Sequence, residues 1–507
     1  MAPLAALTGP APKAGVVVIS LLAACALLLP SRRPRAAAIL GCIVLCPVLL
    51  LADIWPTHRV VEIRHHPLEA FAVAVVALAA VALLAKLVSR RPWLLGLLAV
   101  LALPFRVPVS AGGGSADLLV PLYFVIGAGA IAFALPAALG RAPALELRSR
   151  TDQWAIVWLR RLLAVMIVLY ALQALYSSGF EKALQNEVFF YVPFAVLFCL
   201  LERIEWTPQL LRNCLLLLAA MGIVFSGIAF VEYATKTVLF NTKLVAENQL
   251  YTYFVVNSVF FDPNIFGRFL ALVMVLLAVL LLYDRSSREQ LAIAGVLAVL
   301  WVALVLSLSR SSMAGLLVAL ALVAAFRWNP WRALIAIAVV LAIGGAAIAI
   351  TPTTFGFNQS FNGVSAGRGS VIIGGAKLFA DRPLQGFGSG SFENQYHRHD
   401  PLSGPLTASH TTPVTIGAEQ GLIGLIPYVA LVAVALAMLV PGARRDPARA
   451  AVAAAFAALL VHTMLYADFL EDPSTWALLA VGCALARAPR PQEATAPVSD
   501  RAVPATA

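Results

Sequence analysis

The chain has 507 residues, of which 61% are hydrophobic and 12% are charged, and its formal net charge is +11. Soluble domains contain about 25% charged residues, and a soluble core cannot enclose roughly 310 apolar side chains in a chain of this length. The composition therefore excludes an ordinary soluble globular protein and a disordered chain. The long, continuous apolar runs also argue against an outer-membrane barrel, in which lipid-facing and lumen-facing residues alternate.

Apolar runs follow one another along the chain, and most of them match the roughly 20 residues of a membrane-spanning helix. We therefore predict an all-α, polytopic integral membrane protein with about 12–15 transmembrane helices. The first run is interpreted as a retained helix, because Arg32 and Arg33 follow it, whereas a signal peptide carries its charge in front. The runs lie at about 15–30, 36–53, 70–88, 92–105 (short enough to be re-entrant), 118–140, 156–177, 187–201, 209–231, 264–283, 291–308, 311–326, 331–350, 412–440, 451–467 and 473–487.

The basic residues orient these runs. About 23 of the 36 Lys and Arg residues fall on one alternating set of mostly short connections, and the positive-inside rule makes that set cytoplasmic. The N-terminus is then outside and the C-terminus inside, and the two longest connections, roughly 232–263 and 351–411, lie outside. The positive net charge is thus an indication of topology, and no nucleic-acid partner is predicted.

Three parts are predicted along the chain. Residues 1–230 form N-terminal transmembrane helices, and residues 231–487 form a second transmembrane domain that includes the extracytoplasmic loop 351–411. Residues 488–507 are a Pro/Ala-rich cytoplasmic tail, expected to be disordered. Within the long loop, 368–380 has helical spacing, and the Gly-rich stretch that follows Asp381 predicts a turn.

The stretch 291–326 predicts on which side of the membrane Arg310 lies. As a single helix its 36 residues would be ~54 Å long, well beyond a hydrocarbon core of about 30 Å. It is therefore two passes, and the only polar break is Ser307-Leu-Ser-Arg-Ser-Ser312. Both flanking ends are basic and cytoplasmic, so Arg310 is expected at the outer face.

Three arginines are candidates for ligand binding. Arg268 lies a few residues inside an apolar run, where a charge is costly and tends to line a cavity or to pair. With Arg310 it could clamp a diphosphate bidentately, and Arg368 could be a third ligand. The alternatives are side chains that extend to the membrane interface and, for Arg368, a solvated loop charge.

His410 opens the pass that follows the long loop. A histidine there can act as a general base near neutral pH, although a boundary histidine without a role is the alternative. A metal site built from His397, His399 and His410 lacks a fourth ligand, so no metal is predicted. No nucleotide-binding motif is present, because Lys377 does not directly follow the second glycine of a P-loop pattern.

Four short motifs in a fixed order carry a resemblance over about 250–440. They are Phe261-Asp-Pro-Asn-Ile-Phe-Gly, then Leu308-Ser-Arg-Ser-Ser-Met-Ala-Gly, then an Arg368-led helix with Asp381-Arg-Pro-Leu-Gln-Gly-Phe-Gly, and finally His410-Thr with Glu419-Gln-Gly-Leu-Ile-Gly. This order resembles the O-antigen ligase and O-antigen polymerase family of bacterial envelope glycosyltransferases. Thr411 departs from the family, which often has Asn there.

The resemblance implies an activity and a set of roles. The donor would be a glycan on a polyprenyl diphosphate such as undecaprenyl diphosphate, and the acceptor a hydroxyl of a glycan, a lipid or a protein. Transfer would take place on the outer face of the bacterial cytoplasmic membrane, with inversion and without metal or cofactor. His410 and Arg310 would be catalytic, and Arg268, Arg368 and Glu419 would bind substrate. Ligase and polymerase members share these motifs, so that choice stays open.

Two other classes use similar apolar bulk and intramembrane charge. A secondary transporter or flippase of an anionic or lipid-linked substrate is the main alternative, but such proteins usually show inverted repeats, and no internal similarity is visible here. A structural membrane scaffold would not explain the aligned arginines and histidine.

Overall fold

A computed structural model describes residues 10–54, 65–111, 114–141, 153–239, 241–250, 253–282, 286–328, 331, 335, 368–400 and 408–487. Almost all of the predicted run at 331–350 lies outside these described residues. So do the tail 488–507 and two parts of the long loop, 351–367 and 401–407.

Twelve helical segments in the described part of the chain are long and apolar enough to cross a membrane. The prediction of an all-α, polytopic membrane protein is therefore confirmed. The spans are α1 (Pro10–Leu28), α2 (Arg32–Ile54), α4 (Pro67–Arg90), α6 (Val120–Ala138), α7 (Trp154–Ala174), the continuous run of α8 (Phe180–Asn186), the π-turn η2 (Glu187–Tyr191) and α9 (Val192–Leu201), then α10 (Pro208–Thr235), α12 (Pro263–Leu281), α13 (Ser287–Leu306), α14 (Arg310–Arg327), α19 (Thr412–Leu439) and α20 (Pro447–Leu465).

The shorter elements explain why the spans number fewer than the apolar runs. The runs at 92–105 and 473–487 form only α5 (Leu94–Ala102) and α21 (Pro473–Arg487), which are too short to count as spans. The connections carry α11 (Thr242–Leu250), α17 (Arg368–Asp381) and α18 (Phe392–His399). An antiparallel pair of strands, β1 (Val107–Ala111) and β2 (Gly114–Leu118), was not predicted.

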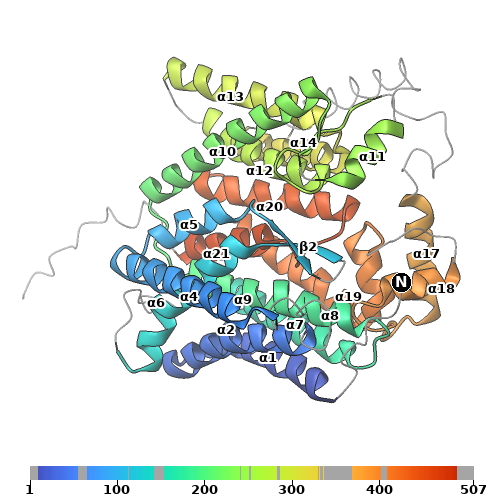
Figure 1. Cartoon of the computed structure of the whole chain (residues 1–507). Helices are drawn as coiled ribbons and strands as arrows, with labels where there is room; N and C mark the ends of the chain where they lie inside the picture. Colours follow the sequence, from blue (N-terminus) through green and yellow to red (C-terminus); the bar gives the residue numbers. More distant parts are fainter. Residues whose placement is uncertain are drawn as a thin grey trace, which may run out of the picture.

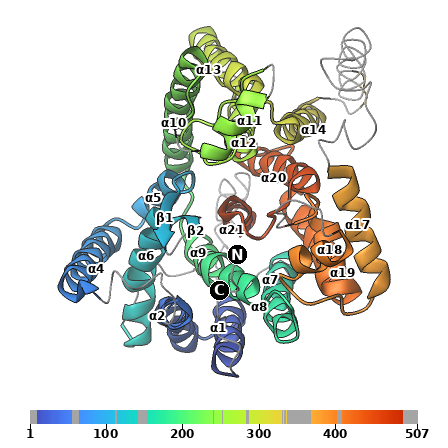
Figure 2. The same cartoon turned by 45° about the vertical axis from the view of Figure 1, so that its right-hand side comes forward.

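The long helices pack side by side around two buried apolar clusters (Figures 1 and 2). One cluster joins α1, α2, α6, α7 and α9 with α19 and α21. The other joins α10, α12, α13, α14 and α20. The first cluster contains residues from both sides of position 230, so the two predicted transmembrane parts share a core; their division into domains stays a prediction.

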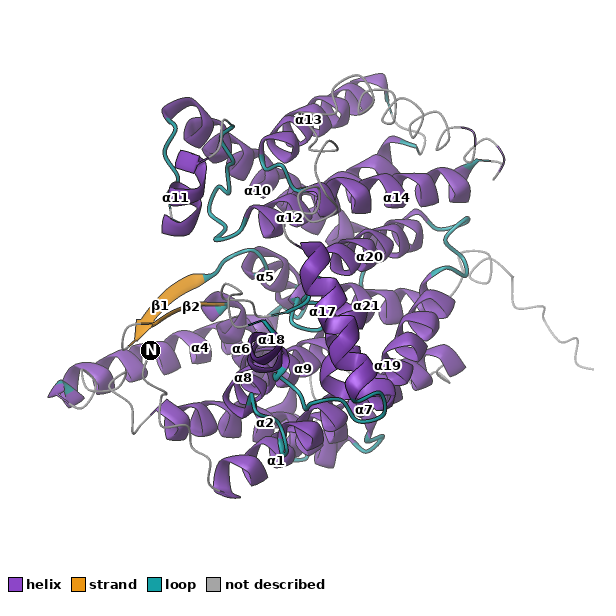
Figure 3. Ribbon diagram, turned by 90° about the vertical axis from the view of Figure 1, so that its right-hand side faces the viewer, coloured by secondary structure: helices purple, strands orange, loops and turns teal. Residues whose placement is uncertain are grey.

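One end of the bundle carries the small helices of the long loop. There α12, α14 and α19 begin, α13 and α20 end, and α17 and α18 cover the helix ends (Figure 3). We call it the α17 end, and the other the opposite end. The predicted helix at 368–380 is confirmed as α17. The predicted break is confirmed too, because α13 ends at Leu306 and α14 begins at Arg310.

A break inside α19 holds the turn that follows α17. Gly421 has φ 63° and ψ −159°, a region that essentially only glycine occupies. The break lets the amides of Leu422 and Ile423 donate to the carbonyls of Pro383 (2.7 Å) and Leu384 (3.1 Å). The Gly-rich turn is therefore pinned to a transmembrane helix by backbone hydrogen bonds.

Gly421→Ala tests this junction. The new Cβ would collide with the carbonyl of Leu384, and the backbone strain alone costs about 1–3 kcal/mol. We expect a lower midpoint of thermal unfolding in detergent. Gly295→Ala is the matched control, because nothing lies within 4 Å of a Cβ at that position of α13. Equal unfolding midpoints for the two variants would contradict the proposed role of the break.

Candidate functional site

The first turns of α12 and α14 dock on each other through small polar side chains. The Ser309 hydroxyl donates to Asn264 Oδ1 (3.0 Å), and the Ser312 hydroxyl donates to the Asn264 carbonyl (3.3 Å). A Cβ at Gly267 would lie 2.7 Å from the Ser309 Cβ, so glycine allows the close approach. These contacts use the Asn and Ser residues of the first two motifs to hold two helix ends together.

Arg310 stands at the first position of α14, with its side chain exposed at the α17 end. The chain reaches it through Leu308, whose φ is 50°. A bulky residue rarely adopts that conformation, so the tight turn is imposed by its surroundings. The buried hydroxyls of Ser309 and Ser312, 2.7 Å apart, fix the turn.

His410 precedes α19 in a similarly constrained turn. Its φ is 60°, a left-handed conformation that histidine adopts more often than most residues. The buried Ser409 hydroxyl donates to the Thr411 carbonyl (2.8 Å), and the Ser409 amide donates to Thr415 Oγ1 (3.1 Å). The Thr412 hydroxyl donates to the carbonyl of Thr463 (3.0 Å). The turn is thus attached both to its own helix and to α20.

Arg368 attaches the start of α17 to the end of α20, close to His410. Its Nη1 donates to the Leu465 carbonyl (3.1 Å) at the end of α20. The next residue, Tyr466, donates its hydroxyl to Asp262 Oδ2 (2.9 Å), and its ring centroid lies 6.3 Å from that of His410. Arg310 acts electrostatically on Arg368 and so belongs to the same group. We call the cluster of Asp262, Arg310, Arg368, His410 and Tyr466 at the α17 end the Arg–His site.

The electrostatics of the Arg–His site favour a neutral imidazole. Burial lowers the pKa of His410 below its usual range, and the Arg368 guanidinium lowers it further, while Asp468 and Asp262 act in the opposite sense. Burial also lowers the pKa of Arg368, which Arg310 lowers further; an arginine remains charged nonetheless. A neutral histidine beside the Arg368 guanidinium, which Arg310 in turn approaches, is suited to accept a proton next to a bound anion.

Arg268 lies deeper in the bundle and is paired. It is 5% exposed, and its Nη2 lies 2.8 Å from Asp472 Oδ2, at the start of α21. The pair forms a second layer beneath the Arg–His site, because Arg268 also acts electrostatically on Tyr466. The predicted role of Arg268 in substrate binding stays a prediction, and its Nη1 has no hydrogen-bond partner among the described residues.

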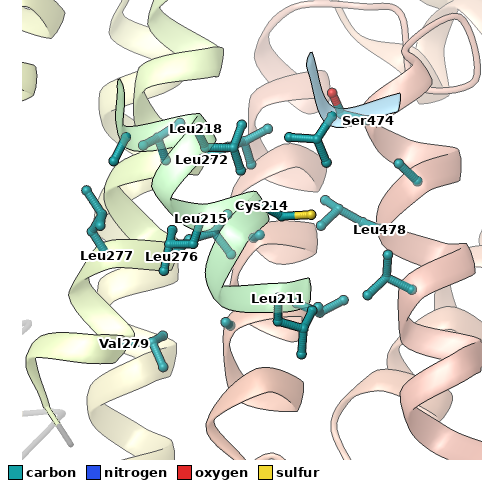
Figure 4. A pocket seen from close by; sticks show the side chains of 18 of the residues that line it. Leu211, Cys214, Leu215, Leu218, Leu272, Leu276, Leu277, Val279, Ser474 and Leu478 are labelled. Atoms are coloured by element: carbon teal, nitrogen blue, oxygen red, sulfur yellow. The ribbon is translucent and has the colours of Figure 1, made fainter. Parts of the chain in front are cut away.

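A long apolar cavity begins at the Arg268–Asp472 pair. Its volume is about 850 Å³, and it runs between α5, α10, α12, α20 and α21 towards the opposite end. Along α12 its lining extends from Ile265 to Leu280, which is ~22 Å at 1.5 Å per residue. Leucines of α10 and α12 line one wall and Leu478 another, and Cys214 points between them (Figure 4). The lining is charged at both ends, with Arg268 and Asp472 at one and Arg212, Glu289 and Asp446 at the other, and the walls between them are largely apolar.

Glu419 lies away from the Arg–His site. Its side chain is buried, and its two carboxylate oxygens accept the amides of Gly390 (2.9 Å) and Phe392 (3.0 Å) at the start of α18. Its predicted substrate binding stays a prediction. The geometry favours a positioning role, in which the carboxylate holds the Gly-rich turn and α18 in place.

The connector between α20 and α21 supplies acidic residues that were not predicted as site residues. Tyr466, Asp468 and Asp472 all lie in this seven-residue segment and contact or act on the predicted arginines and histidine. The available signal was two aspartates at the outer boundary of late apolar runs, where topology needs no charge.

Strained backbone gathers at the α17 end. Non-glycine residues with positive φ in the described ranges are Lys236, Ser258, Leu308, His410 and Asp468. All five lie on connections at this end, and three of them belong to the Arg–His site or lie two residues from one of its members: Leu308, His410 and Asp468. Such strain concentrates at functional sites, where the surrounding structure holds it in place.

His399, in the long loop, has a partner outside the Arg–His site. His399 Nε2 lies 3.4 Å from Asp381 Oδ2, and both side chains are about half exposed. The described residues contain no group of three or more His, Cys, Asp or Glu side chains placed to hold a metal ion.

Comparison with protein families identifies the class. The O-antigen ligase family model matches residues 293–429, from α13 into α19, and so includes Arg310, Arg368 and His410. A comparison with curated proteins found no match. The resemblance predicted from the motifs is thus confirmed: residues 293–429 of this multi-pass membrane protein match the O-antigen ligase model, and the match supports a general function in membrane glycan transfer.

Proposed function

We propose that the protein transfers a glycan from a polyprenyl diphosphate to an acceptor hydroxyl at the outer face of the cytoplasmic membrane. The observation that carries this proposal is the convergence of Arg310, Arg368 and His410 inside the region matched by the O-antigen ligase model. The three residues come from parts of the chain more than 40 positions apart, so their meeting is a property of the fold.

The chemistry is a single displacement. His410 takes the proton of the acceptor hydroxyl, whose oxygen forms a bond to the anomeric carbon. The bond between that carbon and the diphosphate oxygen breaks, and the electron pair leaves with the diphosphate. Arg310 and Arg368 stabilise the charge that grows on the leaving group. One displacement inverts the anomeric centre, and the diphosphate leaves without a nucleotide.

Asp262 and Tyr466 position and charge-balance the residues that carry out this step. The Tyr466 hydroxyl holds the Asp262 carboxylate, which acts as a negative charge on both Arg368 and His410. The carboxylate therefore keeps some proton affinity on the imidazole although the Arg368 guanidinium acts in the opposite sense. We assign Asp262 and Tyr466 positioning roles.

The apolar cavity fits the isoprenoid chain of the donor. Arg268 and Asp472 mark the end nearest the Arg–His site, and the remaining walls are mostly leucine, alanine and valine. A polyprenyl chain laid along this channel would present its diphosphate to the arginines. In this arrangement Arg268 stands at the junction of chain and head group.

The orientation follows from the basic residues. Arg32, Arg203, Arg288 and Arg487 lie at the opposite end of the bundle, which the positive-inside rule places in the cytoplasm. The α17 end with the Arg–His site then faces outwards. Donor and acceptor would meet there after the lipid-linked glycan has reached the outer leaflet.

His410→Ala and Arg310→Ala test the function. Loss of a general base reduces turnover by about 10²–10⁴-fold, and loss of a preorganised charge by about 10²–10³-fold. We expect both effects in kcat when purified protein is given lipid-linked oligosaccharide and candidate acceptors. His66→Ala and Arg398→Ala, on exposed side chains, are controls that keep activity. Full transfer by either site variant would refute the mechanism.

The pH dependence gives a second test. His410 must be neutral to act as a base, so activity falls as pH drops through its lowered pKa. Arg368→Gln removes a positive charge from beside the imidazole and raises that pKa. We therefore expect the acid limb of the kcat/KM profile to move to higher pH, in addition to a lower maximum. Arg398→Gln, on the exposed face of α18, should leave the limb in place. An unmoved limb in Arg368→Gln would exclude His410 as the titrating base.

Cys214→Phe tests the cavity. The larger side chain narrows the channel, and we expect KM for a long-chain polyprenyl donor to rise about tenfold, which is ~1.4 kcal/mol, with a smaller change for a short-chain donor. Val224→Phe is the matched control, because Val224 lies on the same helix, is 58% exposed and does not line the cavity. Equal KM changes for both chain lengths would exclude this channel as the site of the chain.

A further inference from the structure

Four arginines meet at the opposite end of the bundle, far from the Arg–His site. Arg35 is in the first turn of α2, Arg160 in the second turn of α7, Arg203 just after α9, and Arg487 at the end of α21. All four surround Glu202, whose side chain is 2% exposed. We call this set the inner arginine cluster; it lies outside residues 293–429.

Two of the arginines share the single carboxylate. Arg160 donates to Glu202 Oε2 through Nη2 (2.8 Å) and Nε (3.2 Å). Arg487 Nη2 reaches the same oxygen at 3.2 Å, and its Nη1 donates to the Glu202 carbonyl at 3.4 Å. The negative charge of Glu202 is therefore already engaged by two guanidinium groups.

Arg35 and Arg203 form no ion pair within the described ranges. Arg35 is 8% exposed, and its Nε donates to the Leu29 carbonyl (2.7 Å). Arg203 acts on Arg35 as a repelling charge, as does Arg160. The Nε of Arg203 is buried and has no hydrogen-bond partner there. Glu202 attracts both Arg35 and Arg203, but it also pairs with Arg160 and Arg487. Four guanidinium groups therefore share one carboxylate, which leaves an excess of positive charge.

Burial of like charges is unfavourable unless an anion compensates it. A buried unpaired charge costs several kcal/mol, and charges at membrane depth normally pair or bind a ligand. Basic pockets between transmembrane helices on the cytoplasmic side bind anionic lipid head groups. The cluster lies at such helix ends, where a phosphate diester is the anion at highest local concentration.

An apolar strip on α1 leads to the cluster. Val18, Leu21 and Leu28 are each 46–47% exposed, and their spacing puts them on one face of the helix. The strip ends beside Leu29, whose carbonyl holds Arg35. A lipid whose phosphate meets Arg35 and Arg203 would lay an acyl chain along this strip.

We propose that the inner arginine cluster binds the head group of an anionic phospholipid of the inner leaflet, with Arg35 and Arg203 as the phosphate ligands. The lipid neutralises the excess positive charge and ties α1, α2 and the α9–α10 connection to α21. It is a structural lipid, distinct from the polyprenyl donor.

Native mass spectrometry of the full-length protein in mild detergent tests the site. With phosphatidylglycerol and phosphatidylcholine as probes, the wild type should retain phosphatidylglycerol preferentially. In Arg35→Gln/Arg203→Gln the apparent Kd for phosphatidylglycerol should rise at least tenfold. The matched control is Arg288→Gln/Arg445→Gln, which removes two exposed arginines at the same end and should bind as the wild type does. Unchanged binding by the cluster variant would overturn the proposal.

A second measurement distinguishes a lipid ligand from a soluble anion, and a second variant keeps the test valid if the first does not fold. Thermal unfolding is followed with short-chain phosphatidylglycerol or with inorganic phosphate at equal concentration, and only the lipid should raise the midpoint. Equal shifts would overturn the lipid assignment. If the glutamine pair does not fold, Arg35→Lys/Arg203→Lys keeps the charge but loses the planar guanidinium fork. It should keep the preference for phosphatidylglycerol with weaker binding, and equal retention of both lipids by this variant would overturn the site.

Discussion

The hydrogen bond from the Tyr466 hydroxyl to Asp262 joins the end of α20 to the start of α12, and the Arg–His site is assembled around it. Arg368 attaches to the carbonyl just before Tyr466, and His410 lies against its ring. Hydrogen bonds from Ser309 and Ser312 to Asn264 hold the first turns of α12 and α14 together. They therefore also support the position of Asp262, two residues before Asn264. The positions of Arg368 and His410 therefore both depend on the hydrogen bond between Tyr466 and Asp262.

Hydropathy predicted most of the helices, because a bilayer constrains the length and polarity of a spanning helix so strongly; the orientation inferred from charge alternation stays a prediction. The break before Arg310 followed from length alone, and α17 from helical spacing in a loop. The apolar runs at 92–105 and 473–487 do not form full spans, although their hydropathy suggested them. Both are apolar enough for a membrane, but α21 is largely buried among other helices and α5 is partly buried, and hydropathy does not distinguish burial in protein from burial in lipid.

The site was predictable in part. Ordered motifs selected Arg310, Arg368 and His410, which meet in space. Tyr466, Asp468 and Asp472 were missed because their partners are distant in sequence; Asp472, for example, pairs with Arg268 about 200 positions earlier. Glu419 shows that a residue of a family motif need not contact substrate. Its carboxylate accepts hydrogen bonds from two backbone amides that would otherwise need water.

The shortness of α21 sets the spacing of two charged layers. Its first residue follows Asp472, which pairs with Arg268, and its last is Arg487, which pairs with Glu202. Fifteen helical residues span ~22 Å, whereas the hydrocarbon core is about 30 Å thick. The two ion-pair layers therefore lie closer together than the two surfaces of the hydrocarbon core, so at least one of them lies below a membrane surface.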